Sequence, residues 1–220
     1  MSDQSPATRT SPDPRPRGWS WARFWRNGAV IAAVVGLGVW FAVEGVAPNL
    51  SPKNFGVVHE GAIYRSGVLT SAAMHDVIKA HGVRTIVDFG AHEPDTPGQQ
   101  REEQVAAVMG ARYVRLPLFG DGTGDPNRYV EALRVMTDPG APPVLVHCSA
   151  GAERTGGAVA LYRMIVEGAG FDEAYAECAQ FRHDPARNTK LRPYLERWRP
   201  EIERAFREGG TIEYDGPSPK

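Results

Sequence analysis

Residues 144–157 read Val-Leu-Val-His-Cys-Ser-Ala-Gly-Ala-Glu-Arg-Thr-Gly-Gly, and this stretch decides the fold of the chain. An apolar run ends at His147 and Cys148, and Arg154 follows the cysteine after five intervening residues. An apolar pattern with helical spacing then continues through residues 158–166. The stretch predicts a strand, a tight loop and a helix, with the chemistry of the protein located in the loop.

The loop contains the residue types that bind a phosphate group. Backbone N–H groups that curl ahead of a helix N-terminus make a concave anion site, and the guanidinium of Arg154 is suited to clamp two phosphate oxygens. The same positive field favours the thiolate of Cys148, which is the nucleophilic form of this side chain. Gly151 permits a turn that a side chain would resist. We expect Thr155 to hydrogen-bond the sulfur and His147 to hold the loop.

The run His147-Cys148-Ser-Ala-Gly-Ala-Glu-Arg154-Thr155-Gly resembles the signature of the cysteine-dependent protein tyrosine and dual-specificity phosphatases, His-Cys-x-x-Gly-x-x-Arg-[Ser/Thr]-Gly. The resemblance implies that Cys148 attacks phosphorus and forms a phosphocysteine intermediate, with no metal and no cofactor. Arg154 and the loop amides would then hold the phosphate. The expected phosphate-binding residues are Ser149, Ala150, Gly151, Ala152, Glu153 and Arg154.

A second stretch, residues 61–67, reads Gly-Ala-Ile-Tyr-Arg-Ser-Gly and also resembles a run that is common near the start of this superfamily. By this resemblance, Arg65 and Ser66 have structural roles. An orientation of Arg65 towards the active site stays open at this point.

The expected reaction also needs a general acid, because the leaving alkoxide or phenoxide must be protonated and a water must later be activated. In this superfamily the acid is usually an aspartate on a mobile loop, about one strand and one helix before the cysteine. The glycine-rich loop at residues 119–127 has that place and offers Asp121 and Asp125. We predict Asp121, which lies between two glycines. Asp125 is the alternative acid, although it is equally suited to cap the next helix.

Alternating strand and helix patterns predict an α/β domain with a central, mainly parallel sheet flanked by helices, similar to the dual-specificity phosphatases. This phosphatase domain is expected at residues 52–208, and residues 209–220 are expected to form a flexible tail. Strands are predicted in two short segments around Gly61 and at residues 83–89, 112–118 and 143–147. Helices are predicted at residues 69–81, 98–109, 127–137, 155–167, 172–182 and 191–207.

Charge and composition argue against several other classes of function. The net charge of −1 gives no electrostatic reason to expect a nucleic-acid partner. The only two cysteines are Cys148 and Cys178, and no Cys/His spacing suggests a zinc site. Cys178 falls on the apolar side of a predicted helix, so we interpret it as a core residue.

The N-terminal part of the chain differs in character from the rest. Residues 1–27 are rich first in Ser and Pro and then in Trp and Phe, with Arg throughout, and are predicted to form a disordered basic cytoplasmic tail. Residues 28–43 carry no charge, and together with residues 44–47 they approach the roughly 20 residues of a membrane helix. We predict a single-pass transmembrane anchor at residues 28–47. A cleaved secretory signal and a buried soluble helix are the alternatives.

The distribution of charge predicts how this anchor is oriented. Five arginines precede the apolar segment, whereas Glu44 lies near its end and Lys53 is the first basic residue after it. The positive-inside rule then places the N-terminus in the cytoplasm and the catalytic domain outside it.

The substrate class is predicted from the loop. A carboxylate at Glu153 should repel additional phosphates, which favours phosphotyrosine in a phosphorylated protein, or a small phosphomonoester, whereas membrane anchoring favours lipid headgroups. We therefore predict a phosphatase of the phosphotyrosine or dual-specificity type. The alternatives are a phosphoinositide or lipid phosphatase, a sulfur-transfer or arsenate-reducing enzyme, and a catalytically weak phosphate-binding module.

Overall fold

The computed structural model describes residues 21–41 and 52–219, which belong to two separate compact units. The first unit contains helix α1 (Trp21–Phe41), whose side chains between residues 28 and 40 are exposed. Among the described residues, no helix is long and apolar enough to cross a membrane.

The predicted anchor at residues 28–47 thus has no support in the described residues, and residues 42–47 lie outside them. Most of the tail predicted at residues 1–27 also lies outside the described part of the chain. The orientation of the catalytic domain relative to a membrane stays a prediction.

The second unit is built on a five-stranded sheet with the strand order β1-β2-β5-β3-β4. The edge strand β1 (Gly56–His59) pairs with β2 (Ile63–Ser66) in the antiparallel direction. The remaining pairs, formed by β2, β5 (Val144–His147), β3 (Thr85–Asp88) and β4 (Arg112–Arg115), are parallel. The predicted mainly parallel α/β sheet is confirmed. Its central strand is β5, so the loop that begins at Cys148 leaves the sheet at the middle of its carboxyl edge, where such sheets bind ligands.

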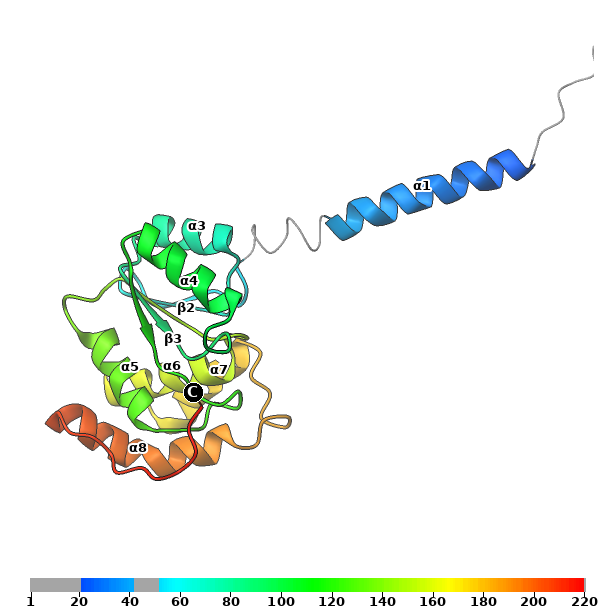
Figure 1. Cartoon of the computed structure of the whole chain (residues 1–220). Coiled ribbons are helices and arrows are strands. Elements are labelled where there is room, and N and C mark those ends of the chain that lie inside the picture. Colours follow the sequence, from blue (N-terminus) through cyan, green and yellow to red (C-terminus); the bar gives the residue numbers. More distant parts are fainter. Residues whose placement is uncertain (1–20, 42–51, 220) are drawn as a thin grey trace, which may run out of the picture. The chain divides into compact units, whose positions relative to one another are not determined.

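Helices cover both faces of the sheet (Figure 1). One face carries α3 (Ser71–His81) and α4 (Pro97–Val108). The other face carries α5 (Asn127–Thr137), α6 (Glu153–Ile165), α7 (Phe171–Gln180) and α8 (Leu191–Glu208). Every helix predicted in this unit is present, with ends that differ by a few residues because terminal turns are the least determined by pattern.

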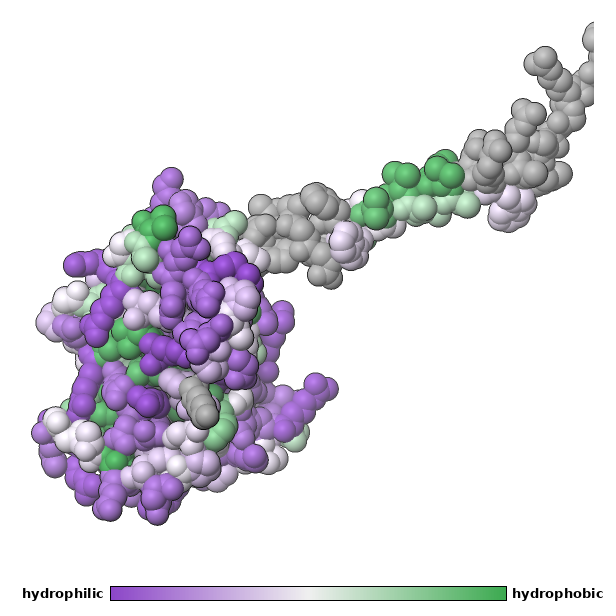
Figure 2. All heavy atoms as spheres, viewed as in Figure 1, coloured by the Kyte–Doolittle hydropathy of each residue, from purple (hydrophilic) through white to green (hydrophobic). Residues whose placement is uncertain are grey.

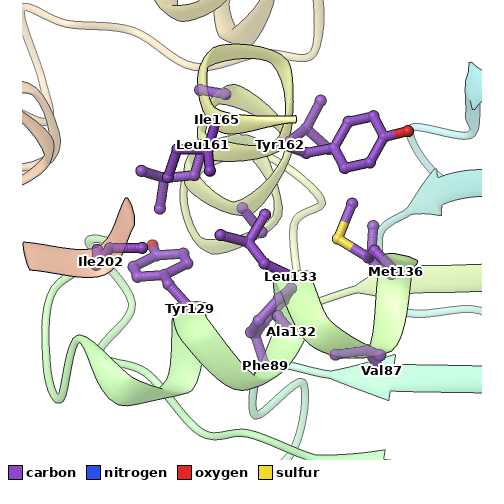
Figure 3. Packing of buried hydrophobic residues seen from close by; sticks show 14 of the residues in the cluster. Val87, Phe89, Tyr129, Ala132, Leu133, Met136, Leu161, Tyr162, Ile165 and Ile202 are labelled. Atoms are coloured by element: carbon purple, nitrogen blue, oxygen red, sulfur yellow. The ribbon is translucent and has the colours of Figure 1, made fainter. Parts of the chain in front are cut away.

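The core of this unit has two parts, one on each side of the sheet. The larger part lies beneath α5 to α8, where Tyr129 and Leu133 of α5 pack towards Leu161 of α6 and Ile202 of α8 (Figure 3). The smaller part lies beneath α3 and α4. All side chains of β3 and β5 are buried, which is expected for central strands of a sheet that is covered on both faces.

Part of the tail at residues 209–219 contacts the domain. Ile212 is buried, donates its N–H to Asn127 Oδ1 (2.7 Å) and accepts from Asn127 Nδ2 (2.9 Å). The ring of Tyr214 meets Trp198 edge-on at 5.8 Å between centroids. In Figure 1 the tail turns back from the end of α8 towards the start of α6. The flexibility expected for residues 209–220 stays a prediction.

Candidate active site

Residues 148–152 of the signature form a compact loop between β5 and α6, which is called the phosphate loop below. Cys148 follows β5 directly, is almost completely buried, and receives a hydrogen bond at Sγ from the N–H of Gly151 (3.2 Å). Gly151 has a φ of +73°, and a Cβ atom there would lie 2.6 Å from the backbone nitrogen of Gly67. Only glycine fits both the backbone conformation and the space. The sequence prediction of a tight loop that depends on Gly151 is confirmed.

The carbonyl groups of the loop are hydrogen-bonded from outside it. Ser149 O accepts from Lys53 Nζ (2.8 Å) and from the N–H of Val68 (3.2 Å). Asn54 Nδ2 lies within hydrogen-bonding distance of Ala150 O (3.3 Å) and Gly151 O (3.1 Å). These donors matter because backbone carbonyls in a tight loop need partners. With their carbonyls held on the outside, the loop amides are left for an anion.

Arg65 supports the same loop from the core. Its side chain is fully buried, donates from Nη2 to Gly151 O (2.7 Å) and lies over the ring of Phe181 at 3.7 Å. Burial lowers the pKa of Arg65 to about 10. The structural role that the sequence resemblance implied for this arginine corresponds to its position behind the phosphate loop.

Arg154 is fixed by backbone carbonyls that follow β3. Its Nη1 donates to Phe89 O (3.0 Å) and to Gly90 O, and its Nη2 donates to Ser149 Oγ (2.5 Å). The turn at Gly90 is in turn held by Asp88, whose Oδ1 accepts from the N–H of Ala91 (2.6 Å). Asp88 therefore orients the Arg154 guanidinium without touching it.

A buried polar cluster lies behind His147. Asp88 Oδ2 accepts from Arg115 Nη1 (2.8 Å) and from Tyr113 Oη (2.9 Å), and the same hydroxyl lies 3.3 Å from Glu102 Oε2. Burial, reinforced by the charge of Asp88, raises the pKa of Glu102 to about 8. His147 Nε2 is 4.0 Å from Glu102 Oε2, and burial lowers the pKa of the imidazole.

This cluster does not have the charge that a metal ion requires. Ligand atoms of Asp88, Glu102 and His147 lie within 4.8 Å of one another. However, Arg115 already neutralises Asp88, and the raised pKa keeps Glu102 largely protonated at neutral pH. We interpret the three residues as a structural support of the loop rather than as a metal centre.

Thr155 does not make the contact that was expected of it. Its hydroxyl is buried at the start of α6 and forms no hydrogen bond to another described residue. The sulfur of Cys148 instead receives the Gly151 N–H, because the tight turn brings that amide under the thiol. The expected bond from Thr155 to the sulfur is therefore absent from the described residues.

Asp121 lies beside the phosphate loop, and its side chain is held by Thr123 and Lys190. Its Oδ1 accepts from the N–H (3.1 Å) and hydroxyl (2.7 Å) of Thr123, and its Oδ2 accepts from Lys190 Nζ (3.0 Å). Partial burial raises the pKa of Asp121, but the hydrogen bonds from Thr123 and Lys190 outweigh it, so the pKa lies below its ordinary value. Asp125 Oδ1 accepts from the N–H of Asn127 (2.9 Å), the first residue of α5, whereas Pro126 occupies the cap position of that helix.

Two cavities adjoin the loop, and the predicted site residues are divided between their linings. The first, of about 420 Å³, is lined by Arg154 and Ser149, and it also contacts Gly120. The second, of about 450 Å³, is lined by Asp121, Glu153 and Lys190 and shares Gly120 with the first. Cys148 lines neither of these two cavities, and the catalytic roles of Cys148 and Arg154 stay predictions. Asp121 stands one residue away from the first cavity, and its role as the acid stays a prediction.

Two supporting groups escaped the sequence analysis. Lys53 was considered only as the first basic residue after the apolar segment, and Asn54 was not considered, because neither belongs to a motif or a periodic pattern. Asn54 has a φ of +52°, and an isolated asparagine next to an apolar strand start was the one available signal of a special backbone position.

Comparison with known proteins places this geometry in a family. The chain is 31% identical over 121 residues to the protein named inositol diphosphatase DSP3 of Arabidopsis thaliana, a match that covers 52% of this chain and 55% of that relative. The chain thus spans about half the length of the curated relative it matches.

Solved structures share the fold at lower identity. The core catalytic domain of PP-IP phosphatase SIW14 from S. cerevisiae superposes with a TM-score of 0.58 at 20% identity, covering 72% of this chain and 93% of that one. TpbA of P. aeruginosa, in complex with pTyr, superposes with a TM-score of 0.58 at 22% identity, covering 76% and 96%.

A family model described as "DSP-PTPase phosphatase fused to NAD+ Kinase" matches residues 37–191, which is well over half of the chain. That range contains the sheet, the phosphate loop and the start of α8. The chain therefore belongs to this family of DSP-PTPase phosphatases, within the cysteine-dependent superfamily that its signature predicted.

Proposed function

We propose that this chain is a cysteine-dependent phosphatase that hydrolyses phosphate monoesters, with a phosphotyrosine or dual-specificity substrate range. One observation carries the proposal: the thiol of Cys148 sits on a loop whose carbonyls are held outward, next to an Arg154 guanidinium oriented by three hydrogen bonds. Such a site binds a phosphate dianion and stabilises the charge that develops during its transfer.

The proposed reaction has two steps. The Cys148 thiolate attacks phosphorus, the S–P bond forms, the P–O bond to the leaving group breaks, and Asp121 gives its proton to the departing oxygen. A water then attacks the phosphocysteine, the Asp121 carboxylate takes a proton from it, and the S–P bond breaks to release phosphate. Arg154 and the amides of residues 149–154 hold the phosphate oxygens in both steps.

The experiment is hydrolysis of p-nitrophenyl phosphate by the full chain in the presence of chelator and reductant. Cys148→Ser should abolish turnover, and activity of the wild type should survive the chelator. Asp121→Asn and Asp125→Asn are compared on phenyl phosphate, whose poorer leaving group exposes the loss of an acid. Binding of vanadate without any turnover by the wild type would favour a phosphate-binding module instead.

A polyphosphorylated substrate such as a diphosphoinositol phosphate, or a phosphoinositide, is the second candidate. It is supported by the identity to a relative named inositol diphosphatase and by Arg187 and Lys190 in the neighbouring cavity. The ratio of kcat/KM for a phosphotyrosine peptide to that for a diphosphoinositol phosphate separates the two candidates.

A further inference from the structure

The cavity in front of Arg154 is lined by two chemically different sets of residues. The apolar set, called the apolar wall below, consists of Pro117, Leu118, Phe119 and Pro219. The polar set includes His92, Glu93 and Arg115. A leaving group attached to a phosphate on Arg154 must enter this cavity, so the chemistry of its lining decides which leaving groups fit.

The apolar wall is completed by the C-terminal tail. Pro219 follows α8 by eleven residues, yet it lines the same cavity as Arg154 and Ser149. The tail is anchored well before that point, because Arg134 Nη2 donates to Gly210 O (2.6 Å), Asn127 pairs with Ile212, and Tyr214 packs on Trp198. Tyr214 Oη also donates to Pro217 O (2.9 Å), which fixes the direction of the last residues. Figure 2 shows this face of the domain as mostly hydrophilic, with small apolar areas.

The end of the tail is also preorganised. Residues 216–219 read Gly-Pro-Ser-Pro, and the two prolines restrict the backbone before any substrate arrives. Pro219 also lies near Gly124, in the loop that carries Asp121: its Cδ would be 3.6 Å from a Cβ at that position. The tail therefore presents a fixed apolar surface rather than a chain that must be ordered by the ligand.

The charges around the cavity disfavour a second phosphate. Arg115 is paired with Asp88, so Arg154 is the cation left to receive an anion among the described residues of this cavity. Glu93 adds a carboxylate to the lining of this cavity. In the neighbouring cavity, Lys190 is paired with Asp121, Arg187 is paired with Asp184 (3.4 Å), and Glu153 adds a further carboxylate.

We propose that the C-terminal tail is a specificity element, in which Pro219 completes an apolar wall that holds the aromatic ring of an aryl phosphate. This proposal rests on the proposed phosphatase function and narrows its substrate class. The tail then selects aryl monoesters, such as phosphotyrosine in an extended peptide, over alkyl and polyphosphorylated esters. Ring stacking on Phe119 and Pro219 supplies the selectivity, and the phosphate itself is bound equally in all cases.

The test introduces a charge into the wall of the full chain with Pro219→Asp. Ser218→Asp is the matched control, because it introduces the same charge one residue earlier, at an exposed side chain that does not line the cavity. In a Cys148→Ser background, dissociation constants are measured by calorimetry for a phosphotyrosine peptide, a phosphoserine peptide and inorganic phosphate. We expect Pro219→Asp to weaken phosphotyrosine about tenfold, which is the usual effect of a lost apolar contact in a binding pocket, with phosphate changed less than twofold.

The outcomes are distinguishable. Equal weakening of all three ligands would mean a general charge effect and would overturn the proposal, as would no change in any of them. Tighter binding of all three would show that the tail obstructs the site rather than selecting its ligands. Because these measurements need no turnover, they decide the role of Pro219 even if the wild type proves inactive, and failure of p-nitrophenyl phosphate hydrolysis remains a separate result.

Discussion

Asn54 is predicted to position the phosphate loop, although it lies almost a hundred residues from Cys148 in sequence. Its Nδ2 group is close to three carbonyl oxygens, those of Ala150, Gly151 and Phe181, at 3.3, 3.1 and 2.8 Å. Its φ of +52° is one that glycine adopts without strain, so Asn54→Gly removes the amide and leaves the backbone conformation accessible.

The expected change in the free energy of unfolding follows from the hydrogen bonds that are lost. An amide group has two hydrogens, so it makes two good bonds at a time, each with a net contribution of about 0.5–1.5 kcal/mol. Asn54→Gly should therefore lower the free energy of unfolding by about 1–3 kcal/mol. Asn54→Asp should cost more, because a carboxylate offers no donor and repels the carbonyl oxygens that the amide binds. Since a shift of about 1 Å at a catalytic group can cost 100-fold in rate, kcat/KM should fall by tenfold or more in both variants.

The assay combines urea unfolding with the inhibition constant of vanadate, which reports the loop amides directly. Asp95→Gly is the control, because Asp95 also has a positive φ of 60° and lies away from the loop. If Asn54→Asp kept wild-type stability and vanadate affinity, the idea that outward-held carbonyls shape this loop would be wrong.

Three further predictions concern the groups around the loop. Gly151→Ala should abolish activity and lower the free energy of urea unfolding by about 2–5 kcal/mol, because it combines an unfavourable φ with a contact of 2.6 Å to Gly67 N. Gly61→Ala is the control: its φ is +71° but its surroundings are open, so the loss should be only about 1–2 kcal/mol. Lys190→Met removes a hydrogen bond that lowers the pKa of Asp121, so the basic limb of the kcat profile should move to higher pH; an unmoved limb would argue for a different acid. Glu102 has a pKa raised to about 8, so the folded state binds an extra proton between about pH 4.5 and 8 and loses stability as the pH rises through that window. Glu102→Gln removes this group, so the variant should lose less stability than the wild type between pH 5 and pH 8. The expected difference is a few kcal/mol, at about 1.4 kcal/mol per pKa unit, and thermal unfolding across pH measures it.

The fold and the place of Cys148 at the end of a central strand could be predicted because local patterns specify them. The apolar run before Cys148 and the helical pattern after Arg154 identify a strand–loop–helix unit without any knowledge of the rest of the chain. The caps of α3 show the same point, since Thr70 accepts from the N–H of Ala73 (3.2 Å) and Gly82 ends the helix at a φ of +62°. Signals of this kind act over a few residues, so a single sequence contains them in full.

The surroundings of Asp121 could not be predicted, because they depend on residues distant in sequence. Lys190 lies 69 residues after Asp121, and Asn188 Nδ2 also donates to Asp121 O (2.9 Å). No spacing rule links two loops separated by several helices. The pairing of Ile212 with Asn127 has the same cause, because 85 residues separate the two in sequence.

A short signature thus indicates the chemistry, whereas residues outside the signature maintain the geometry of the loop. The carbonyl of Gly151 is held by Arg65 and Asn54, and the guanidinium of Arg154 is oriented through a turn that Asp88 fixes. A loop that binds a dianion must keep its amides converged even when it is empty, and its own residues cannot supply the outward partners for the carbonyls. Substitutions at Asn54 and Asp88, which no signature includes, should therefore reduce phosphate binding as much as conservative changes within the signature do.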